Sequence, residues 1–337
     1  MKQEGVKVDA SQKFIDAITS KRKGVSGYPS YLEYNLKDGN LQIKLRGSGK
    51  SKFRGLDAWG LAVYSKAKEE GIETGTILFS IAKDVGIPTP DLEALKRRVS
   101  YLKFNNKNID FKLIDEAKPE AERLYSEYEL FNRPDEEVRP HIRRRGDRDK
   151  VGRLEKDFQT FLYGKGLDKL DEERTNERLA VLGEDFFKVK RGGFCQVREF
   201  PTGAFKGRIS ERNRILPTEY VDIVTFNKRK ELSVIELKLD DSGLEVISQI
   251  LDYALFFKCY VRKLKCGSLN KLYEESGLSN RTQGDEARIV CYVVSNHFHP
   301  RFDEVAKYYS TKSRRYGFII KKVELGHAEE LGQSEKS

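Results

Sequence analysis

The chain has 337 residues, and 63 Lys and Arg side chains against 53 Asp and Glu side chains give it a formal net charge of +10. A hydrophobic content of 38% excludes a disordered chain, and at roughly 100–200 residues per domain the length predicts about two domains. The most apolar stretch, 251–261, falls short of the ~18 residues of a membrane span, and the polar start is unlike a signal peptide. The positive charge favours a polyanionic partner, nucleic acid before membrane.

The four cysteines, Cys195, Cys259, Cys266 and Cys291, include no C-x2-C pair. Their spacing therefore does not predict a zinc site. They are also too few for a disulfide scaffold in a chain of this length, which indicates a reducing compartment. We expect a cytoplasmic protein with no membrane partner.

The N-terminal part, residues 1–131, is predicted to form a mixed α+β domain. Alternating apolar and polar residues over 31–45, on both sides of Asp38-Gly39, predict a β-hairpin. Three helices are expected after it, at 56–70, 76–85 and 91–104.

The second and third of these helices are joined at Gly86-Ile-Pro. A pair of short helices with a Gly at the turn resembles a helix-turn-helix, and on this interpretation the domain binds DNA or regulates the rest of the chain. The alternative is plain helical packing, because any two short helices joined in this way give the same pattern.

Residues 132–150 are predicted to be a basic linker. The stretch is polar, contains Pro134 and Pro140, and includes the run Arg143-Arg-Arg-Gly-Asp-Arg-Asp-Lys. Two interpretations stay open: a solvated connection, or a strap that contacts phosphates between two DNA-facing domains.

The C-terminal part, residues 151–325, has a clearer order of elements. They are a helix at 152–163, strands near 186–190 and 196–200, a hairpin of 219–227 with 232–239, a helix at 244–261, a strand at 288–295, a helix at 302–309 and a strand at 316–324. This order predicts an α/β domain with a mixed sheet flanked by helices. The polar tail, 326–337, is expected to be disordered.

The predicted hairpin brings charged residues together. With its turn centred on Arg229, Asp222 lies directly opposite Glu236, and Lys238 is two residues farther along on the same side of the sheet. Both faces also carry Val, Ile, Leu or Phe side chains, which predicts a central hairpin that is covered on both sides.

Two carboxylates that face each other on a partly buried sheet repel one another. A divalent cation such as Mg²⁺ removes this conflict, since it prefers oxygen ligands and binds through one or two carboxylates plus phosphate and water. Lys238 could then position or deprotonate an attacking water. This arrangement predicts metal-dependent hydrolysis of phosphodiesters; the alternative is ordinary charge alternation on a wet strand.

Three further polar residues fit the same site. Gln249 and Tyr253 lie four residues apart, on one face of the helix that follows the hairpin. Glu155 lies one turn from Phe158, at the inner edge of the first helix of this domain. The alternatives are a polar helix edge for the Gln–Tyr pair and a surface charge for Glu155.

Asp222, a spacer of thirteen residues and then Glu236-Leu237-Lys238 resemble the Asp…Glu-x-Lys core of the restriction-endonuclease-like nuclease superfamily. The run Gln249-Ile-Leu-Asp-Tyr253 is similar to the Gln-x3-Tyr element of its RecB-type branch. The family's proline before the aspartate is absent, since Val221 stands there.

The resemblance implies a restriction-endonuclease-like fold for residues 151–325 and a metal site within it. Asp222, Glu236 and the Leu237 carbonyl would bind Mg²⁺ or Mn²⁺. Glu155 fits the acid of the family's first helix and would be an auxiliary ligand.

The resemblance also implies a catalytic group beside the metal. The catalytic residues would be Lys238, the two acids Asp222 and Glu236, and the motif residues Gln249 and Tyr253, with Gln249 steadying the lysine or the DNA. The run 154–162, the strand around Glu236 and the closing strand–helix–strand further resemble Shedu-type antiphage nucleases.

We therefore expect a two-domain, Mg²⁺-dependent endonuclease that cuts DNA, in bacterial antiphage defence or restriction. The C-terminal domain would cut, and the N-terminal domain would bind DNA or control access or assembly. A homo-oligomer is expected, because such assemblies are common among nucleases that cut both strands, and an activator or partner protein is left open. The alternatives are a non-catalytic DNA-binding regulator and an RNA-cleaving, ligand-activated effector nuclease.

Overall fold

The structure is a computed structural model of the whole chain. It describes residues 13–15, 18, 27–37, 39–47, 52–118, 123–131, 153–163, 178–183, 186, 196–206, 208–217, 219–239, 243–260, 267–275, 288–311 and 317–325. The chain divides into two compact units, Met1–Glu127 and Tyr128–Ser337. The predicted linker, 132–150, and tail, 326–337, lie outside the described residues.

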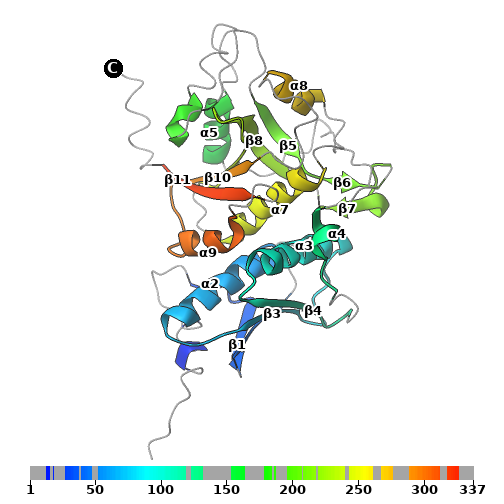
Figure 1. Cartoon of the computed structure of the whole chain (residues 1–337), viewed down its shortest axis with the longest axis vertical. Coiled ribbons are helices and arrows are strands. Elements are labelled where there is room, and N and C mark those ends of the chain that lie inside the picture. Colours follow the sequence, from blue (N-terminus) through cyan, green and yellow to red (C-terminus); the bar gives the residue numbers. More distant parts are fainter. Residues whose placement is uncertain are drawn as a thin grey trace, which may run out of the picture. The chain divides into compact units, whose positions relative to one another are not determined.

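The first unit contains a four-stranded sheet and two long helices (Figure 1). In chain order its elements are β1 (Leu32–Lys37), β2 (Asn40–Leu45), the 3-10 turn η1 (Lys52–Gly55), α2 (Leu56–Glu69), β3 (Thr76–Ile81), α3 (Thr89–Asn105) and β4 (Asp110–Asp115). The strand order is β1-β2-β3-β4, with β1 antiparallel to β2 and the other neighbours parallel.

The helices α2 and α3 are the crossovers between the parallel strands of this sheet. Gly60 lets α2 approach it closely, because a Cβ atom at this position would come within 2.5 Å of the Phe79 ring. Along β1, buried residues alternate with exposed ones, as they do in a strand with one face against a core.

The hairpin at 31–45 and the helices at 56–70 and 91–104 are confirmed, but the helix predicted at 76–85 is wrong. Residues Thr76–Ile81 form β3, the parallel neighbour of both β2 and β4. A short apolar run does not distinguish a buried strand from a buried helix, and here the sheet decides. The predicted helix-turn-helix therefore lacks its first helix.

The second unit is a mixed α/β unit built on a five-stranded sheet. Its helices are α4 (Glu127–Phe131), α5 (Arg153–Tyr163), α7 (Glu245–Tyr260), α8 (Gly267–Glu275) and α9 (Phe302–Tyr309), with 3-10 turns η4 (Leu179–Leu182) and η5 (Glu211–Asn213). Its strands are β5 (Val197–Pro201), β6 (Ala204–Phe205), β7 (Arg214–Leu216), β8 (Tyr220–Phe226), β9 (Leu232–Leu237), β10 (Ile289–Ser295) and β11 (Phe318–Glu324).

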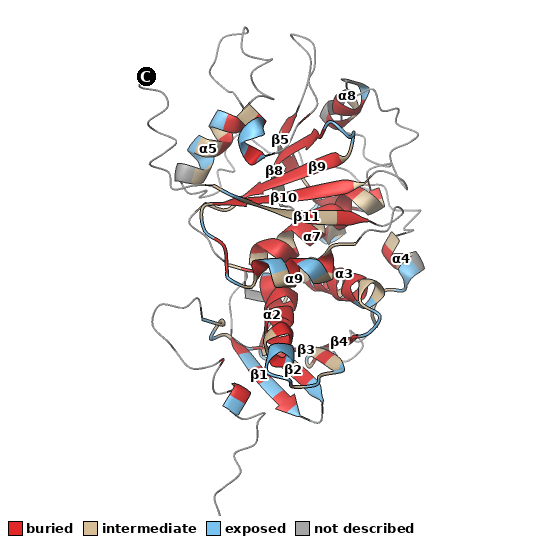
Figure 2. Ribbon diagram, turned by 60° about the vertical axis from the view of Figure 1, so that its left-hand side comes forward, coloured by how far each residue is buried: buried red, intermediate tan, exposed pale blue. Residues whose placement is uncertain are grey.

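The sheet of the second unit has the order β11-β10-β9-β8-β5. The strands β9, β10 and β11 are parallel, and the β5–β8 and β8–β9 pairs are antiparallel. The hairpin of β8 and β9 is therefore central, as the apolar residues on both of its faces predicted. Figure 2 shows its strands and β10 almost entirely buried.

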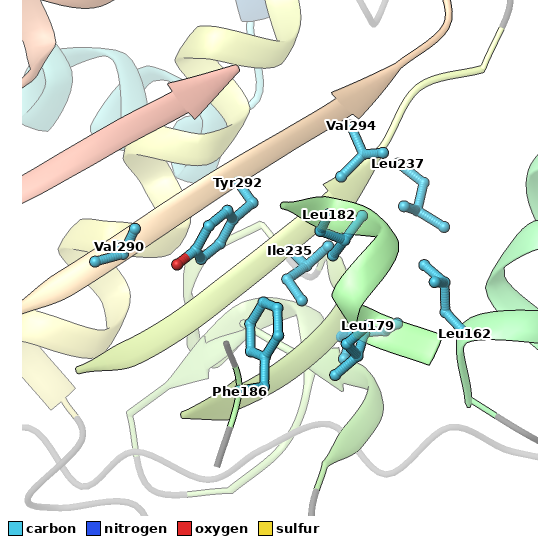
Figure 3. Close-up of a cluster of buried hydrophobic side chains, with 10 residues drawn as sticks. Leu162, Leu179, Leu182, Phe186, Ile235, Leu237, Val290, Tyr292 and Val294 are labelled. Atoms are coloured by element: carbon cyan, nitrogen blue, oxygen red, sulfur yellow. The ribbon is translucent and has the colours of Figure 1, made fainter. Parts of the chain in front are cut away.

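A compact apolar cluster holds one face of this sheet to α5 and η4 (Figure 3). Leu162 of α5 packs with Ile235 and Leu237 of β9, and Tyr292 of β10 stacks in a tilted arrangement on Phe186. The opposite face receives α7, which contacts β9 and β10. The layered arrangement fixes β8 and β9 from both sides.

The predicted elements from 152 onward match the structure closely, except between 186 and 190. Phe186 makes an isolated antiparallel bridge to Asn227, and residues 187–190 lie outside the described part of the chain. The structure adds β6, β7 and α8, which the sequence did not predict. Within the described ranges, no helix has both the length and the apolar character needed to cross a membrane.

Candidate functional site

The β8–β9 hairpin has the register that the sequence predicted. Ile223 pairs with Ile235, so Asp222 and Glu236 come next in line, opposite each other and on one side of the sheet. The turn is shaped by Asn227, whose side-chain oxygen accepts hydrogen bonds from two backbone N–H groups of the turn, at 2.9 and 3.0 Å. An even register of this kind is what places the two carboxylates together.

Glu236 is the most deeply buried acid of the site. It lies in the middle strand β9, between β8 and β10, and is 2% exposed. Among the residues that the structure describes, no donor reaches its Oε2 atom. A buried carboxylate oxygen without a hydrogen bond is costly, so this atom would be stabilised by a cation.

Lys238 places its ammonium group against two oxygen atoms of the predicted metal site. Its Nζ atom lies 2.6 Å from Oε1 of Glu236 and 3.2 Å from the carbonyl oxygen of Leu237. Burial alone would lower the pKa of Lys238, but the carboxylates of Glu236 and Asp222 outweigh burial and raise it. The side chain is therefore a cation among the oxygen atoms that the resemblance assigns to a metal ion.

Asp222 is held in place through both of its carboxylate oxygens. Oδ2 accepts a hydrogen bond from the backbone N–H of Leu237 at 2.8 Å. Oδ1 accepts one from Nε2 of Gln159, on α5, at 3.0 Å. These bonds fix the carboxylate beside β9.

The electrostatics of the pair are unfavourable without added positive charge. Burial raises the pKa of Asp222 to about 7; Lys238 opposes this rise, and Glu155 and Glu199 add to it. Burial also raises the pKa of Glu236 well above its usual value, with a further contribution from Asp222. A buried carboxylate whose ionisation is disfavoured by a half-buried carboxylate beside it is typical of a cation site.

Glu155 and Glu199 complete the acidic surroundings of Asp222. Glu155 is in the first turn of α5 and close enough to raise the pKa of Asp222. Glu199 was not predicted; its two neighbours in β5 pair with the two neighbours of Asp222 in β8, and it has a backbone φ of 48°. Few non-glycine residues have this conformation, and those that do cluster at functional sites.

The predicted Gln249–Tyr253 pair ties α7 to the start of β8. Nε2 of Gln249 donates to Oη of Tyr253 at 2.6 Å, and this hydroxyl donates to the carbonyl oxygen of Tyr220 at 3.1 Å. Burial, followed by the charge of Glu236, raises the pKa of Tyr253 well above its usual value. Tyr253 is therefore a neutral phenol beside the acids, and a direct contact of Gln249 with Lys238 stays a prediction.

Gln159 is a site residue that the sequence reasoning missed. Its Oε1 atom accepts hydrogen bonds from Nε and Nη2 of Arg198 at 3.2 and 2.8 Å, while its Nε2 atom donates to Asp222. The amide therefore joins a guanidinium on β5 to the carboxylate on β8. A signal was present, because Gln159 lies one helical turn after Glu155, on the same side of α5.

Comparisons of the chain with protein-family models, with curated proteins and with solved structures found no match.

The donor atoms at the site suit a hard divalent cation. They are the carboxylates of Asp222 and Glu236 and the carbonyl of Leu237, and Mg²⁺ or Mn²⁺ is commonly bound by such oxygens together with water and phosphate. The unpartnered Oε2 of Glu236 supports this fit. No group of three or more His, Cys, Asp or Glu side chains among the described residues is arranged to hold a metal, and Glu155 as a direct ligand stays a prediction.

Replacing Gln159 with leucine should lower the free energy of unfolding by about 2 kcal/mol, because Asp222 loses a donor and Arg198 loses an acceptor in a partly buried place. Chemical denaturation of the metal-free protein measures this loss. Thr160→Val is the matched control: it removes a side-chain hydrogen bond from the next position of α5, to the Lys156 carbonyl in an exposed setting, and should change stability by less than about 0.5 kcal/mol. Equal losses in the two variants would contradict the bridging role.

Proposed function

We propose that this protein is a metal-dependent nuclease that hydrolyses phosphodiester bonds of DNA, and that its second unit has a restriction-endonuclease-like fold of the RecB-type branch. One observation supports this most strongly. Asp222 and Glu236 each adjoin the last pair of the β8–β9 register, Ile223 with Ile235, on a central hairpin. The ammonium of Lys238 contacts both Glu236 and the Leu237 carbonyl.

The proposed cofactor is Mg²⁺ or Mn²⁺, and the residues that would hold it are Asp222, Glu236 and Leu237 through its carbonyl oxygen. When bound, such an ion stabilises the negative charge that builds up on a phosphate during hydrolysis. Gln159 and the Leu237 N–H keep Asp222 aimed at the site before substrate arrives, so this part of the site is preorganised.

Lys238 is the proposed proton-transfer residue. It is an ammonium here because neighbouring carboxylates raise its pKa against the effect of burial. Neutralising those carboxylates would leave burial as the dominant influence and lower the pKa. Nζ could then take a proton from the attacking water, or position that water for attack on phosphorus.

The acidic site would be repulsive for a polyanion without its cation, and this gives the proposal a direct test. Purified protein is incubated with supercoiled plasmid, linear duplex, single-stranded DNA and RNA in Mg²⁺, Mn²⁺ or EDTA. We expect DNA strand cleavage with either metal ion and none in EDTA. Cleavage of RNA alone would favour the effector-nuclease alternative, whereas binding without cleavage of any substrate would favour the regulator.

The proposed biological setting, bacterial antiphage defence or restriction, rests on the Shedu-type resemblance of the α5 run and the Glu236 strand. The regulator alternative has lost one of its two supports, because its helix-turn-helix included a helix at 76–85 that is strand β3. Homo-oligomerisation remains a proposal, because such assemblies are common among nucleases that cut both strands.

A further inference from the structure

A two-stranded arm extends from the strand pair that carries Asp222. It comprises β6 and β7, which pair antiparallel, and the turn between them, which contains η5. The arm continues β5 and β8 directly, since Pro201 pairs with Tyr220 and the backbone N–H of Thr202 donates to the Glu219 carbonyl at 2.9 Å. We call residues 204–206 and 208–216 the basic arm.

The basic arm concentrates positive charge at the surface. It contains Lys206, Arg208, Arg212 and Arg214 against a single acidic residue, Glu211. The first three of these cations are exposed, and none of them forms an ion pair with another side chain that the structure describes. The exposed side chains of Lys206, Arg208 and Arg212 are therefore available to an anionic partner.

The arm has its own anchors, so the backbone that carries its cations is held in a defined place. Phe205 and Leu216 are buried, at 1% and 4% exposure, and the Arg214 guanidinium lies over the Phe205 ring at 5.4 Å. Across the turn, the backbone N–H of Lys206 donates to the Asn213 carbonyl at 2.8 Å. A positioned arm loses less conformational entropy on binding than a flexible loop would.

The root of the arm lies at the acidic end of the candidate site. Glu219, which accepts the bond from Thr202, directly precedes β8 and stands three residues before Asp222. Arg212 precedes Asp222 by ten residues, which at about 3.3 Å per residue limits their separation to roughly 33 Å. That span equals about one turn of duplex DNA, ~34 Å.

We propose that the basic arm is a nucleic-acid-binding element that contacts backbone phosphates within about one duplex turn of the bond cut at Asp222 and Glu236. This inference rests on the proposed nuclease function and names how its substrate is held. Ile209, which lies between Arg208 and Arg212 in the sequence, is an apolar residue with 45% of its surface exposed and would lie against the sugars of the backbone. Phosphate and sugar contacts position a duplex without reading its sequence.

The test is a triple variant, Lys206→Gln with Arg208→Gln and Arg212→Gln, whose affinity for a fluorescent duplex is measured in EDTA over a range of salt. Removing three phosphate contacts should weaken binding about tenfold or more. The slope of log affinity against log salt should become shallower by about 2.7, because each contact contributes about 0.9. An unchanged affinity and slope would overturn the proposal.

Two controls separate the arm from net charge and from misfolding. The variant Lys68→Gln with Lys83→Gln and Lys107→Gln removes the same charge from exposed positions of the first unit, and should retain the wild-type slope. A charge-retaining arm variant, with Lys206→Arg and Arg208→Lys, should restore binding. Equal loss in the first control, or no restoration in the second, would assign the effect to net charge or to folding and overturn the proposal.

The competing partner is an anionic membrane, because an apolar tip between arginines also suits lipid. Binding to vesicles that contain phosphatidylserine tests this alternative. Arm-dependent binding to vesicles but not to duplex would overturn the inference. The binding measurement involves no catalytic step, so the two proposals can fail separately. A protein that binds DNA through the basic arm but cuts no substrate would support the binding role of the arm and contradict the nuclease function.

Discussion

Replacing Lys238 with methionine should lower the rate of DNA cleavage by about 10³-fold while the affinity for Mn²⁺ rises. The two readouts move in opposite directions because the ammonium has two roles. It is the proposed proton-transfer group, and in the metal-free protein it lies against Glu236 and Leu237, whose oxygen atoms a metal ion would need.

The same substitution should destabilise the metal-free protein. Glu236 is 2% exposed, and removing one partner of a buried ion pair leaves an uncompensated charge. The carboxyl would respond by binding a proton, since its pKa is already raised by burial. Added Mn²⁺ should restore the lost stability, because it replaces the missing positive charge.

Single-turnover cleavage, calorimetric Mn²⁺ titration and thermal unfolding measure these effects. Lys307→Met is the matched control, because Lys307 is an exposed lysine of α9 in the same unit, and it should leave all three readouts at wild-type values. A Lys238→Met protein that is folded and still cuts at the wild-type rate would remove Lys238 from the mechanism. Loss of Mn²⁺ binding would instead mean that the lysine supports the site rather than competing for it.

The affinity for Mn²⁺ should rise about tenfold per pH unit between about pH 5 and pH 7 and then level off. The pKa of Asp222 is raised to about 7, so below that pH the ion must displace a proton from the carboxyl. Binding at pH 6 should release close to one proton per ion from Asp222, and any proton held by Glu236, whose pKa is also raised, adds to that count.

The stability of the metal-free protein should change with pH in the opposite sense. A carboxyl whose pKa is higher in the folded state than its ordinary 3.8 binds more protons when folded, so folding stability falls as the pH rises through this interval. The loss should extend over the pH range from about 4 to about 7 and be reversed by Mn²⁺. Lys238 limits the loss, because its charge favours the ionised carboxylates.

Asp222→Asn provides the comparison for both pH effects, with Asp303→Asn, an exposed acid in the first turn of α9, as the control. We expect the Asp222 variant to bind Mn²⁺ at least tenfold more weakly and to lose most of the pH dependence. Calorimetry in two buffers of different ionisation enthalpy reports the proton count. A wild-type affinity that is flat from pH 5 to pH 7 would show that Asp222 is not the group that the ion displaces.

The hairpin was predictable because its determinants are local. Alternation of apolar residues sets the strand faces, and Asn227 with the polar residues after it sets the turn, so the opposition of Asp222 and Glu236 followed from counting residues. The length and central position of β8 and β9 followed from apolar residues on both faces. Local patterns of this kind are the part of a fold that a single sequence specifies best.

The first unit shows where local patterns fail. Residues Thr76–Ile81 have an apolar run that suits helix or strand, and the outcome depends on β2 and β4, which pair with it from 36 and 34 positions away in the register. β4 itself, Asp110–Asp115, was not predicted. Parallel pairing requires partners that are distant in sequence, so the strand could not be recognised from its own residues.

The supporting shell of the site was missed for a similar reason. Gln159 and Arg198 lie 39 positions apart and meet only because α5 packs beside β5 and β8. Glu199 takes its place opposite Asp222 through the β5–β8 register. Groups that act on the motif residues from other elements become visible only in three dimensions.

The most direct test of the central claim is a crystal structure of the protein soaked with Mn²⁺, with the ion located by its anomalous scattering. We expect a peak bound by the carboxylates of Asp222 and Glu236 and by the carbonyl oxygen of Leu237, with Nζ of Lys238 moved away from Oε1 of Glu236. An Mn²⁺ peak elsewhere, with the ion pair of Lys238 and Glu236 intact at a saturating concentration of metal, would contradict the assignment of these residues as a metal-dependent nuclease site.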